Sequence, residues 1–112
     1  MITKKAFWIS YDLGLKGDYS GFYTWLDTVK AKECGDSIAF FTKENKYNEN
    51  LIEDIVIEIK KYVNLSKTDR VYLIYLENIS GKVKGYFLFG GRKRAPWEGF
   101  AAGIHGVDED FE

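Results

Sequence analysis

The stretch AFWISYDLGLKGDYSGFYTWLDTVK, residues 6–30, passes from a strand pattern to a helix pattern through a glycine-rich loop. Residues 6–11 are apolar at almost every position, which is typical of a strand covered on both faces. Asp12 ends this run. Asp18 or Ser20 can cap the following helix, because their side chains accept hydrogen bonds from its first free amides. The helix has its apolar positions at helical spacing, and they are Phe22, Trp25, Leu26 and Val29.

The rest of the chain repeats these two patterns. A short strand, a turn at residues 34–36 and a stronger strand over residues 37–42 come next. Residues 51–63 form the clearest helix pattern, with acids early and lysines late, as the helix dipole favours. Residues 69–77 predict a second central strand, and residues 82–91 predict a strand that returns from it. The buried stripe expected for the second helix is Leu51, Ile52, Ile55, Val56, Ile59 and Tyr62.

This order of elements indicates an α+β fold, a ferredoxin-like α/β sandwich with an antiparallel sheet and two helices on one face. We expect residues 1–91 to form this domain. Residues 92–112 would be a C-terminal extension with an acidic end, packing on the domain or on a partner subunit. The second sheet face carries aromatic residues, so we expect a homodimer in which a second copy covers it. The alternative is that the extension covers this face itself.

Composition narrows the function classes. The chain has 112 residues, which suits one domain, and its aromatic share of 17% favours a bulky core and an interface. The single cysteine, Cys34, excludes an internal disulfide and a cysteine-rich metal site. We see no run apolar enough for a signal peptide or a membrane span, so we expect a cytoplasmic protein without membrane contact.

Charge is unevenly distributed along the chain. The formal net charge is −1, from 16 basic and 17 acidic residues. Four of the acids lie in residues 107–112, which leaves 16 basic against 13 acidic residues in the body. A mildly basic body permits nucleic-acid binding without requiring it. The alternative is an ordinary domain with a solubilising tail.

Asp12 is the best single candidate for chemistry. An acid at the carboxyl end of a central strand lies at an edge of the sheet where ligands often bind. Mg²⁺ is bound by one or two carboxylates together with waters and substrate phosphates. One carboxylate is too few for a tight site, so a metal at Asp12 requires a dimer that brings two copies of Asp12 together. The alternative is a turn residue that bonds nearby amides.

Residues 90–100, GGRKRAPWEGF, are the second candidate. Arg92, Lys93 and Arg94 are three consecutive cations, and Trp97 and Phe100 follow closely. Cations that hold phosphates and aromatic rings that stack on bases are typical of a nucleic-acid groove. In the competing interpretation the two aromatic residues anchor the C-terminal segment against the sheet or a partner, and the cations stay solvated.

The motifs WISYDL, followed by a helix, and CGDSIAFF resemble those of the CRISPR-associated Cas-two proteins and their relatives, including VapD-type toxins. The matching residues are Tyr11, Asp12, Leu13, Ser37, Ile38 and Phe40. The resemblance implies a ferredoxin-like fold, a homodimer and a final strand that pairs with the partner's sheet. It also implies a divalent metal at Asp12 for phosphodiester cleavage, although other members act as DNA-holding scaffolds. The family usually has arginines in its first loop and helix, whereas residues 14–30 have none.

Two functions from different classes follow. The first is a nucleic-acid-binding homodimer. This homodimer would also be a Mg²⁺-dependent endoribonuclease if Asp12 holds the metal. The cations Arg92, Lys93 and Arg94 would then hold phosphates of RNA or DNA. The second is a non-enzymatic protein–protein interaction module that uses the aromatic C-terminal segment. No motif names an organic cofactor, so a small-molecule enzyme ranks third, and whether the chain is an enzyme stays open.

Overall fold

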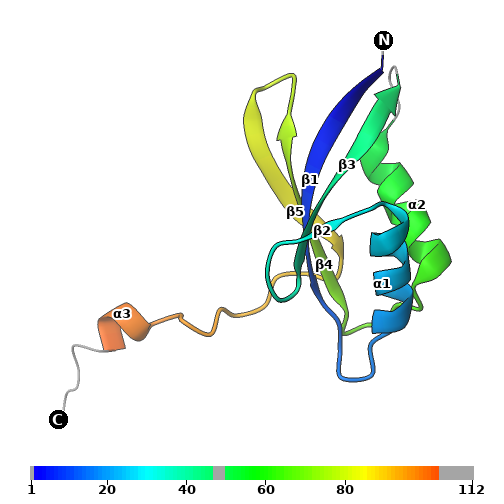
Figure 1. The fold of residues 1–112 in the computed structure, drawn as a ribbon. Helices are drawn as coiled ribbons and strands as arrows, with labels where there is room; N and C mark the ends of the chain where they lie inside the picture. The colour runs from blue at the N-terminus through cyan, green and yellow to red at the C-terminus, as the bar shows by residue number, and fades with distance from the viewer. Residues whose placement is uncertain (1, 47–49, 104–112) are drawn as a thin grey trace.

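The computed structural model describes residues 2–46 and 50–103 of the chain (Figure 1). Its elements, in chain order, are β1 (Ile2–Asp12), α1 (Tyr19–Thr28), β2 (Lys32–Glu33), β3 (Ile38–Lys46), α2 (Leu51–Tyr62), β4 (Arg70–Glu77), β5 (Lys82–Phe89) and α3 (Phe100–Gly103). The strands form one sheet in the order β2-β3-β1-β4-β5, with every neighbouring pair antiparallel and with β2 and β5 at its edges. The expected α+β class and antiparallel sheet are confirmed, and α1 and α2 lie on the same side of the sheet (Figure 1).

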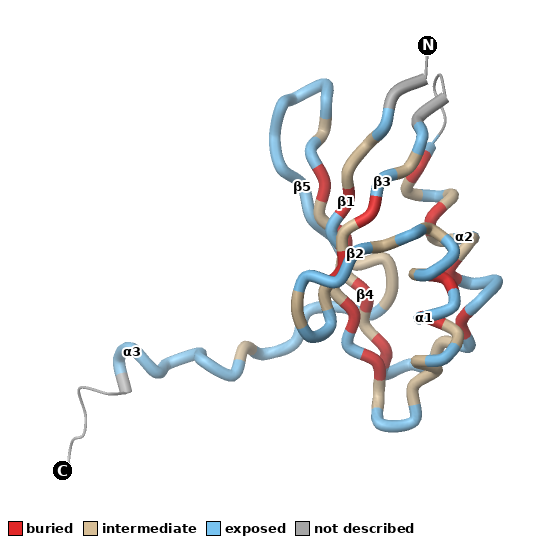
Figure 2. The backbone as a smooth tube through the Cα atoms, in the orientation of Figure 1, coloured by how far each residue is buried: buried red, intermediate tan, exposed pale blue. Residues whose placement is uncertain are grey.

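The core fills the layer between the sheet and these two helices. Alternate residues of β1 and β4 point into this layer because successive side chains of a strand face opposite sides. Phe7, Ile9 and Leu73 are completely buried there, and red segments of the tube mark the layer in Figure 2. Trp25 of α1 is also completely buried, and its indole N–H donates to a carboxylate oxygen of Glu58 on α2 at 3.2 Å. The expected central position of β1 and β4 in the sheet is therefore confirmed, but the helices cover only one face of each strand.

Asp18 joins the beginning of α1 to the segment after α2. One oxygen of its carboxylate accepts from the backbone N–H of Gly21 at 2.9 Å, which confirms Asp18 as the cap. The other oxygen accepts from the backbone N–H of Asn64 at 2.8 Å. The Asn64 bond first, and the Gly21 bond second, hold the pKa of this carboxyl below its ordinary value. A side chain at Gly21 would begin 2.3 Å from the carbonyl oxygen of Tyr62, so the glycine permits the close approach of the two helices.

The predicted stripe of α2 is correct in part: three of its six residues are buried, Ile52 and Val56 are half-buried, and Tyr62 at its end is exposed. Leu51, Ile55 and Ile59 are buried, and Asn50 caps the helix by accepting from Glu53 N at 3.2 Å. Tyr62 was expected in the stripe, but its side chain is 40% exposed. The reason is that α2 ends at Tyr62 and the extended residue Val63 takes the buried place instead.

The chain leaves the sheet after β5 as an arm, residues 90–103. The turn begins at Gly90, whose φ of +75° favours glycine. The arm runs away from the sheet, on the side opposite α1 and α2, and ends in the short helix α3 (Figure 1). The helix patterns of the sequence do not include this segment, so α3 was not expected. The acidic end of the extension, like His105, lies outside the described residues.

In the part of the chain that the structure describes, we find no helix of the length and apolar character needed to cross a membrane.

Candidate nucleic-acid interface on the open sheet face

The sheet has an open face, opposite the face that α1 and α2 cover. Trp8, Ser10 and Asp12 of β1 point to it, because they alternate with the buried residues of the same strand. Trp8 pairs with Phe40 of β3 on one side and with Ile74 of β4 on the other. The rings of Trp8 and Phe40 lie 5.0 Å apart between centroids. Three central strands therefore place one row of apolar side chains on this face.

This apolar area extends along the sheet toward the β4–β5 turn. We call it the apolar patch, and it consists of Trp8, Phe40, Ile74, Leu76 and Val83. Trp8 is 40% exposed, Leu76 50% and Val83 72%. A contiguous exposed patch of large apolar side chains marks an interaction surface more often than isolated ones do. The apolar patch is therefore a candidate interaction surface.

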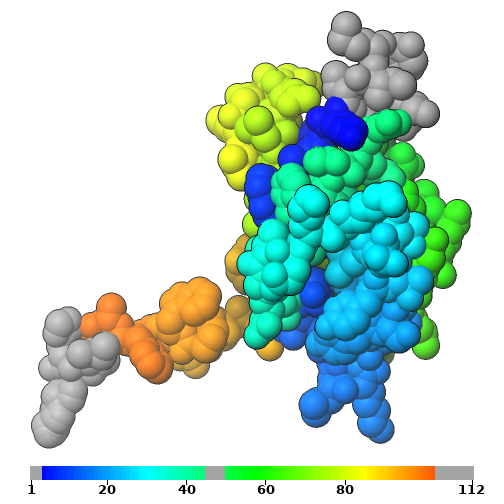
Figure 3. All heavy atoms as spheres, in the orientation of Figure 1, coloured from blue at the N-terminus to red at the C-terminus, as the bar shows by residue number. Residues whose placement is uncertain are grey.

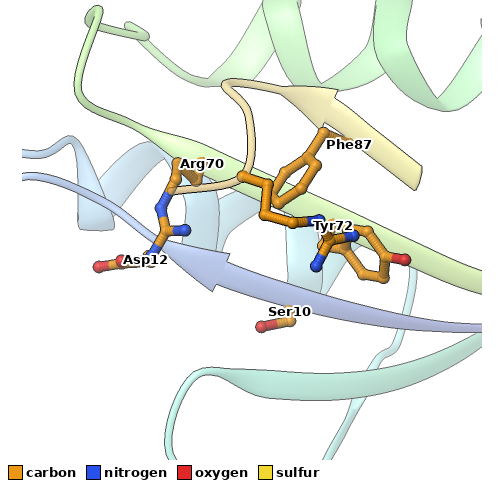
Figure 4. Close-up of a pocket in the computed structure, with 6 residues that line it drawn as sticks. Ser10, Asp12, Arg70, Tyr72 and Phe87 are labelled. Atoms are coloured by element: carbon orange, nitrogen blue, oxygen red, sulfur yellow. Dashed lines mark hydrogen bonds and ion pairs between the residues drawn. The ribbon is translucent and has the colours of Figure 1, made fainter. Parts of the chain in front are cut away.

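A pocket lies beside the apolar patch, at the end of the sheet where β1 ends and β4 begins (Figure 4). We call it the arginine pocket; its lining residues are Ser10, Asp12, Arg70, Tyr72, Phe87 and Arg92, and its volume is about 280 Å³. Asp12 and Arg70 are direct cross-strand neighbours, and Arg70 Nη2 donates to Asp12 Oδ2 at 2.6 Å. The carboxylate that the sequence singled out therefore forms an ion pair with a guanidinium.

Arg92 enters the same pocket from the beginning of the arm. Its guanidinium carbon lies 5.6 Å from the ring centroid of Phe87 and 5.9 Å from that of Tyr72, so both rings support the cation by cation–π contact. The two rings meet edge to face at 4.8 Å. A Cβ at Gly85 would lie 2.6 Å from the hydroxyl of Tyr72. Any other residue at position 85 would therefore clash with the Tyr72 side chain in this position. Arg92 forms no ion pair with a carboxylate among the described residues.

A buried acid, Asp69, joins the loop after β1 to the turn before β4. It is 1% exposed, and its two oxygens accept from Gly14 N at 2.8 Å and from Ser66 N at 2.7 Å. The first bond holds the loop that follows Asp12, and the second holds the turn that precedes Arg70. Asp69 therefore holds the backbone next to both members of the ion pair, and its carboxylate forms no hydrogen bond with either side chain. Sequence reasoning missed this role, because an acid before an apolar strand is also a common turn residue.

The structure brings only two of the predicted site residues together. Asp12 and Arg92 both line the arginine pocket. Lys93, Arg94, Trp97 and Phe100 lie on the arm, all exposed, and Arg94 and Glu98 form a solvated i,i+4 ion pair at 3.7 Å. Trp97 is 73% exposed and Phe100 65%, so neither anchors the arm on its own sheet.

The pocket of one chain does not make a metal site. Asp12 is its single carboxylate, and Arg70 already binds one of its oxygens. Across the described residues there is no group of three or more potential metal ligands of the His, Cys, Asp or Glu type. A magnesium ion at Asp12 would need further ligands from a second copy or from a substrate.

No protein-family model, curated protein or solved structure matches this chain significantly. The resemblance to the Cas-two proteins therefore rests on its short sequence motifs and on the order of its elements.

Proposed function

We propose that the protein binds RNA or DNA as a homodimer and that Arg70 and Arg92 hold phosphates of the strand. The observation that carries this proposal is the position of Arg92. Its guanidinium is supported by two aromatic rings in a pocket with a second arginine, and no described carboxylate neutralises it. A guanidinium matches a phosphate group with two parallel hydrogen bonds. Lys93 and Arg94 continue the cationic track onto the arm.

The fold supports the same interpretation. From β1 to β4 the elements follow the order β-α-β-β-α-β, which is that of ferredoxin-like folds. β5 then adds a fifth strand beside β4. In such a fold the face without helices is free to bind a partner, and here the apolar patch and the arginine pocket share it.

The homodimer accounts for the apolar parts of the surface. A second copy stacked on the apolar patch would stand on the side toward which the arm runs (Figure 1). The exposed Trp97 and Phe100 of each arm could then contact the other copy. With two-fold symmetry, the same surface of each copy would be buried in the interface. The view of all heavy atoms shows the arm separated from the bulk of the molecule (Figure 3). The arginine pocket at the end of the sheet would stay available to the nucleic acid.

The binding function is tested with a triple variant, Arg92→Ala, Lys93→Ala and Arg94→Ala. We expect its affinity for a labelled single-stranded RNA to fall by at least about tenfold at low salt, because three phosphate contacts are lost. The slope of log affinity against log salt concentration should become shallower by about two, at roughly 0.7 per contact on a single strand. Fluorescence anisotropy at several salt concentrations measures both quantities.

A matched control removes charge on the opposite side of the molecule. Lys60→Ala with Lys61→Ala changes two exposed cations at the end of α2. This variant should bind RNA nearly as the wild type does. Equal affinity and equal salt slope in the triple variant and the wild type would refute the proposed function.

The ion pair between Asp12 and Arg70 favours binding without cleavage. We expect Asp12→Ala to bind RNA several-fold more tightly than the wild type, because it removes the acid that competes with phosphate for Arg70. EDTA should not change the affinity of the wild type. Gel analysis of the same RNA serves as the check on catalysis. Cleavage that requires Mg²⁺, stops with EDTA and is lost in Asp12→Ala would instead support a Mg²⁺-dependent endoribonuclease built from two copies of Asp12.

A further inference from the structure

The arginine pocket holds more hydrogen-bond donors than the protein itself uses. A guanidinium has five N–H donors. Arg70 directs Nη2 to Asp12, and Arg92 donates to no described protein acceptor. The hydroxyl of Ser10 likewise has no hydrogen-bond partner among the described residues, and it lines the same pocket. The pocket therefore offers free donors to a ligand with several acceptor oxygens.

The arrangement of these donors points to one small anionic group. Ser10 lies on β1 directly opposite Tyr72 of β4, between Asp12 and Tyr72 in Figure 4. A group seated over Ser10 thus has the Arg70–Asp12 pair on one side and the ring that supports Arg92 on the other. The volume of about 280 Å³ lies just below the usual range for small-molecule sites. The pocket can accept a phosphate and the sugar attached to it rather than a long segment of strand.

The number of acceptor oxygens separates two kinds of phosphate. A phosphodiester inside a strand offers two free oxygens and one negative charge. A terminal phosphomonoester offers three and a charge of about −1.5 to −2. We propose that the arginine pocket binds the terminal phosphate of a phosphorylated RNA or DNA strand, with Arg70, Arg92 and Ser10 as the donors. This inference rests on the proposed function and names the part of the nucleic acid that the pocket recognises.

Asp12 then competes with the phosphate of the ligand for the guanidinium of Arg70. With Arg70, Arg92 and Asp12 ionised, the pocket carries a net charge of +1, so the number of donors, and not the charge, favours a phosphomonoester over a phosphodiester as long as Asp12 is present. The ligand must share Arg70 with Asp12 or displace it. Removing the charge of Asp12 while keeping its shape, as in Asp12→Asn, should therefore strengthen the binding of a terminal phosphate more than that of an internal one.

The test compares oligonucleotides of one sequence that carry a 5′-phosphate, a 3′-phosphate or hydroxyl groups at both ends. Fluorescence anisotropy with an internal label gives the preference, defined as the affinity for a phosphorylated oligonucleotide divided by that for the unphosphorylated one. For at least one of the two ends we expect a preference of about tenfold in the wild type, or about 1.4 kcal/mol. Arg70→Ala should reduce it to about one, Ser10→Ala should reduce it partly and Asp12→Asn should raise it. Circular dichroism confirms that each variant is folded.

Lys93→Ala is the matched control, because Lys93 is an exposed cation outside the pocket. It should weaken the binding of every oligonucleotide equally and leave the preference unchanged. Equal binding of all three oligonucleotides by the wild type would overturn the terminal-phosphate inference but leave the proposed function intact. Failure to bind any of them would overturn the proposed function. If adenosine monophosphate or inorganic phosphate alone binds as tightly as the phosphorylated oligonucleotide, the ligand is a free phosphate compound and the strand-end assignment is wrong.

Discussion

Replacing Asp69 by alanine is expected to lower the free energy of unfolding by about 3 kcal/mol, because hydrogen bonds to a charged group contribute about 1.5–3 kcal/mol each. The carboxylate is 1% exposed and accepts two backbone hydrogen bonds, from Gly14 and Ser66. Alanine leaves both N–H groups without this acceptor. Thermal unfolding followed by circular dichroism should show a melting temperature lower by roughly 10 °C.

Two further variants test whether the loss of stability comes from the two hydrogen bonds of Asp69. Asp69→Asn keeps one accepting oxygen and should lose about half as much stability. Asp36→Ala removes an exposed acid in the turn before β3 and should leave the melting temperature nearly unchanged. A melting temperature of Asp69→Ala equal to that of the wild type would show that the loop after Asp12 is held by other contacts. The role of Asp69 in positioning the pocket would then be lost.

A second large change is expected in the dissociation constant of the homodimer. We expect the wild type to be a dimer at micromolar concentration, and we expect the double variant Trp97→Ala, Phe100→Ala to raise the dissociation constant at least about a hundredfold. Buried aromatic hot spots at interfaces are worth about 2 kcal/mol or more each, and about 1.4 kcal/mol corresponds to a factor of ten. Sedimentation velocity over a range of concentrations measures this constant.

Ile79→Ala is the matched control, because Ile79 is 99% exposed at the β4–β5 turn, away from the arm. It should leave the dissociation constant unchanged. Ile74→Glu places a charge in the apolar patch and should abolish the dimer. A monomeric wild type would refute the homodimer. A dimer that survives the loss of both arm aromatics but not Ile74→Glu would assign the interface to the patch alone.

The sequence predicts the fold well where the spacing of apolar residues is regular. The apolar runs of β1 and β4 are long enough to be recognised as strands, and Asp18, one of the two caps expected for the first helix, is the cap of α1. Tyr62 was wrongly placed in the core because periodicity does not show where a helix ends. Val63, the extended residue that follows α2, is the one that belongs to the core.

The site could be predicted only in part, because its residues meet through strand pairing. Asp12 was found from its position at the end of a strand, but its partner Arg70 is 58 residues away. Arg92 was found as part of a run of cations, whereas Tyr72 and Phe87 look like ordinary strand residues. The register of β4 against β1 and β5 brings them together, and register depends on the whole sheet rather than on any short stretch.

The two edges of the sheet differ in a way that bears on unwanted self-association. β2 is two residues long, whereas β5 presents an eight-residue edge with backbone groups free to pair with any extended chain. Such an edge can act as a template for aggregation. Lys82 and Lys84 lie along it, and charged side chains oppose the addition of another strand. These two lysines therefore oppose edge-to-edge association of the protein at high concentration.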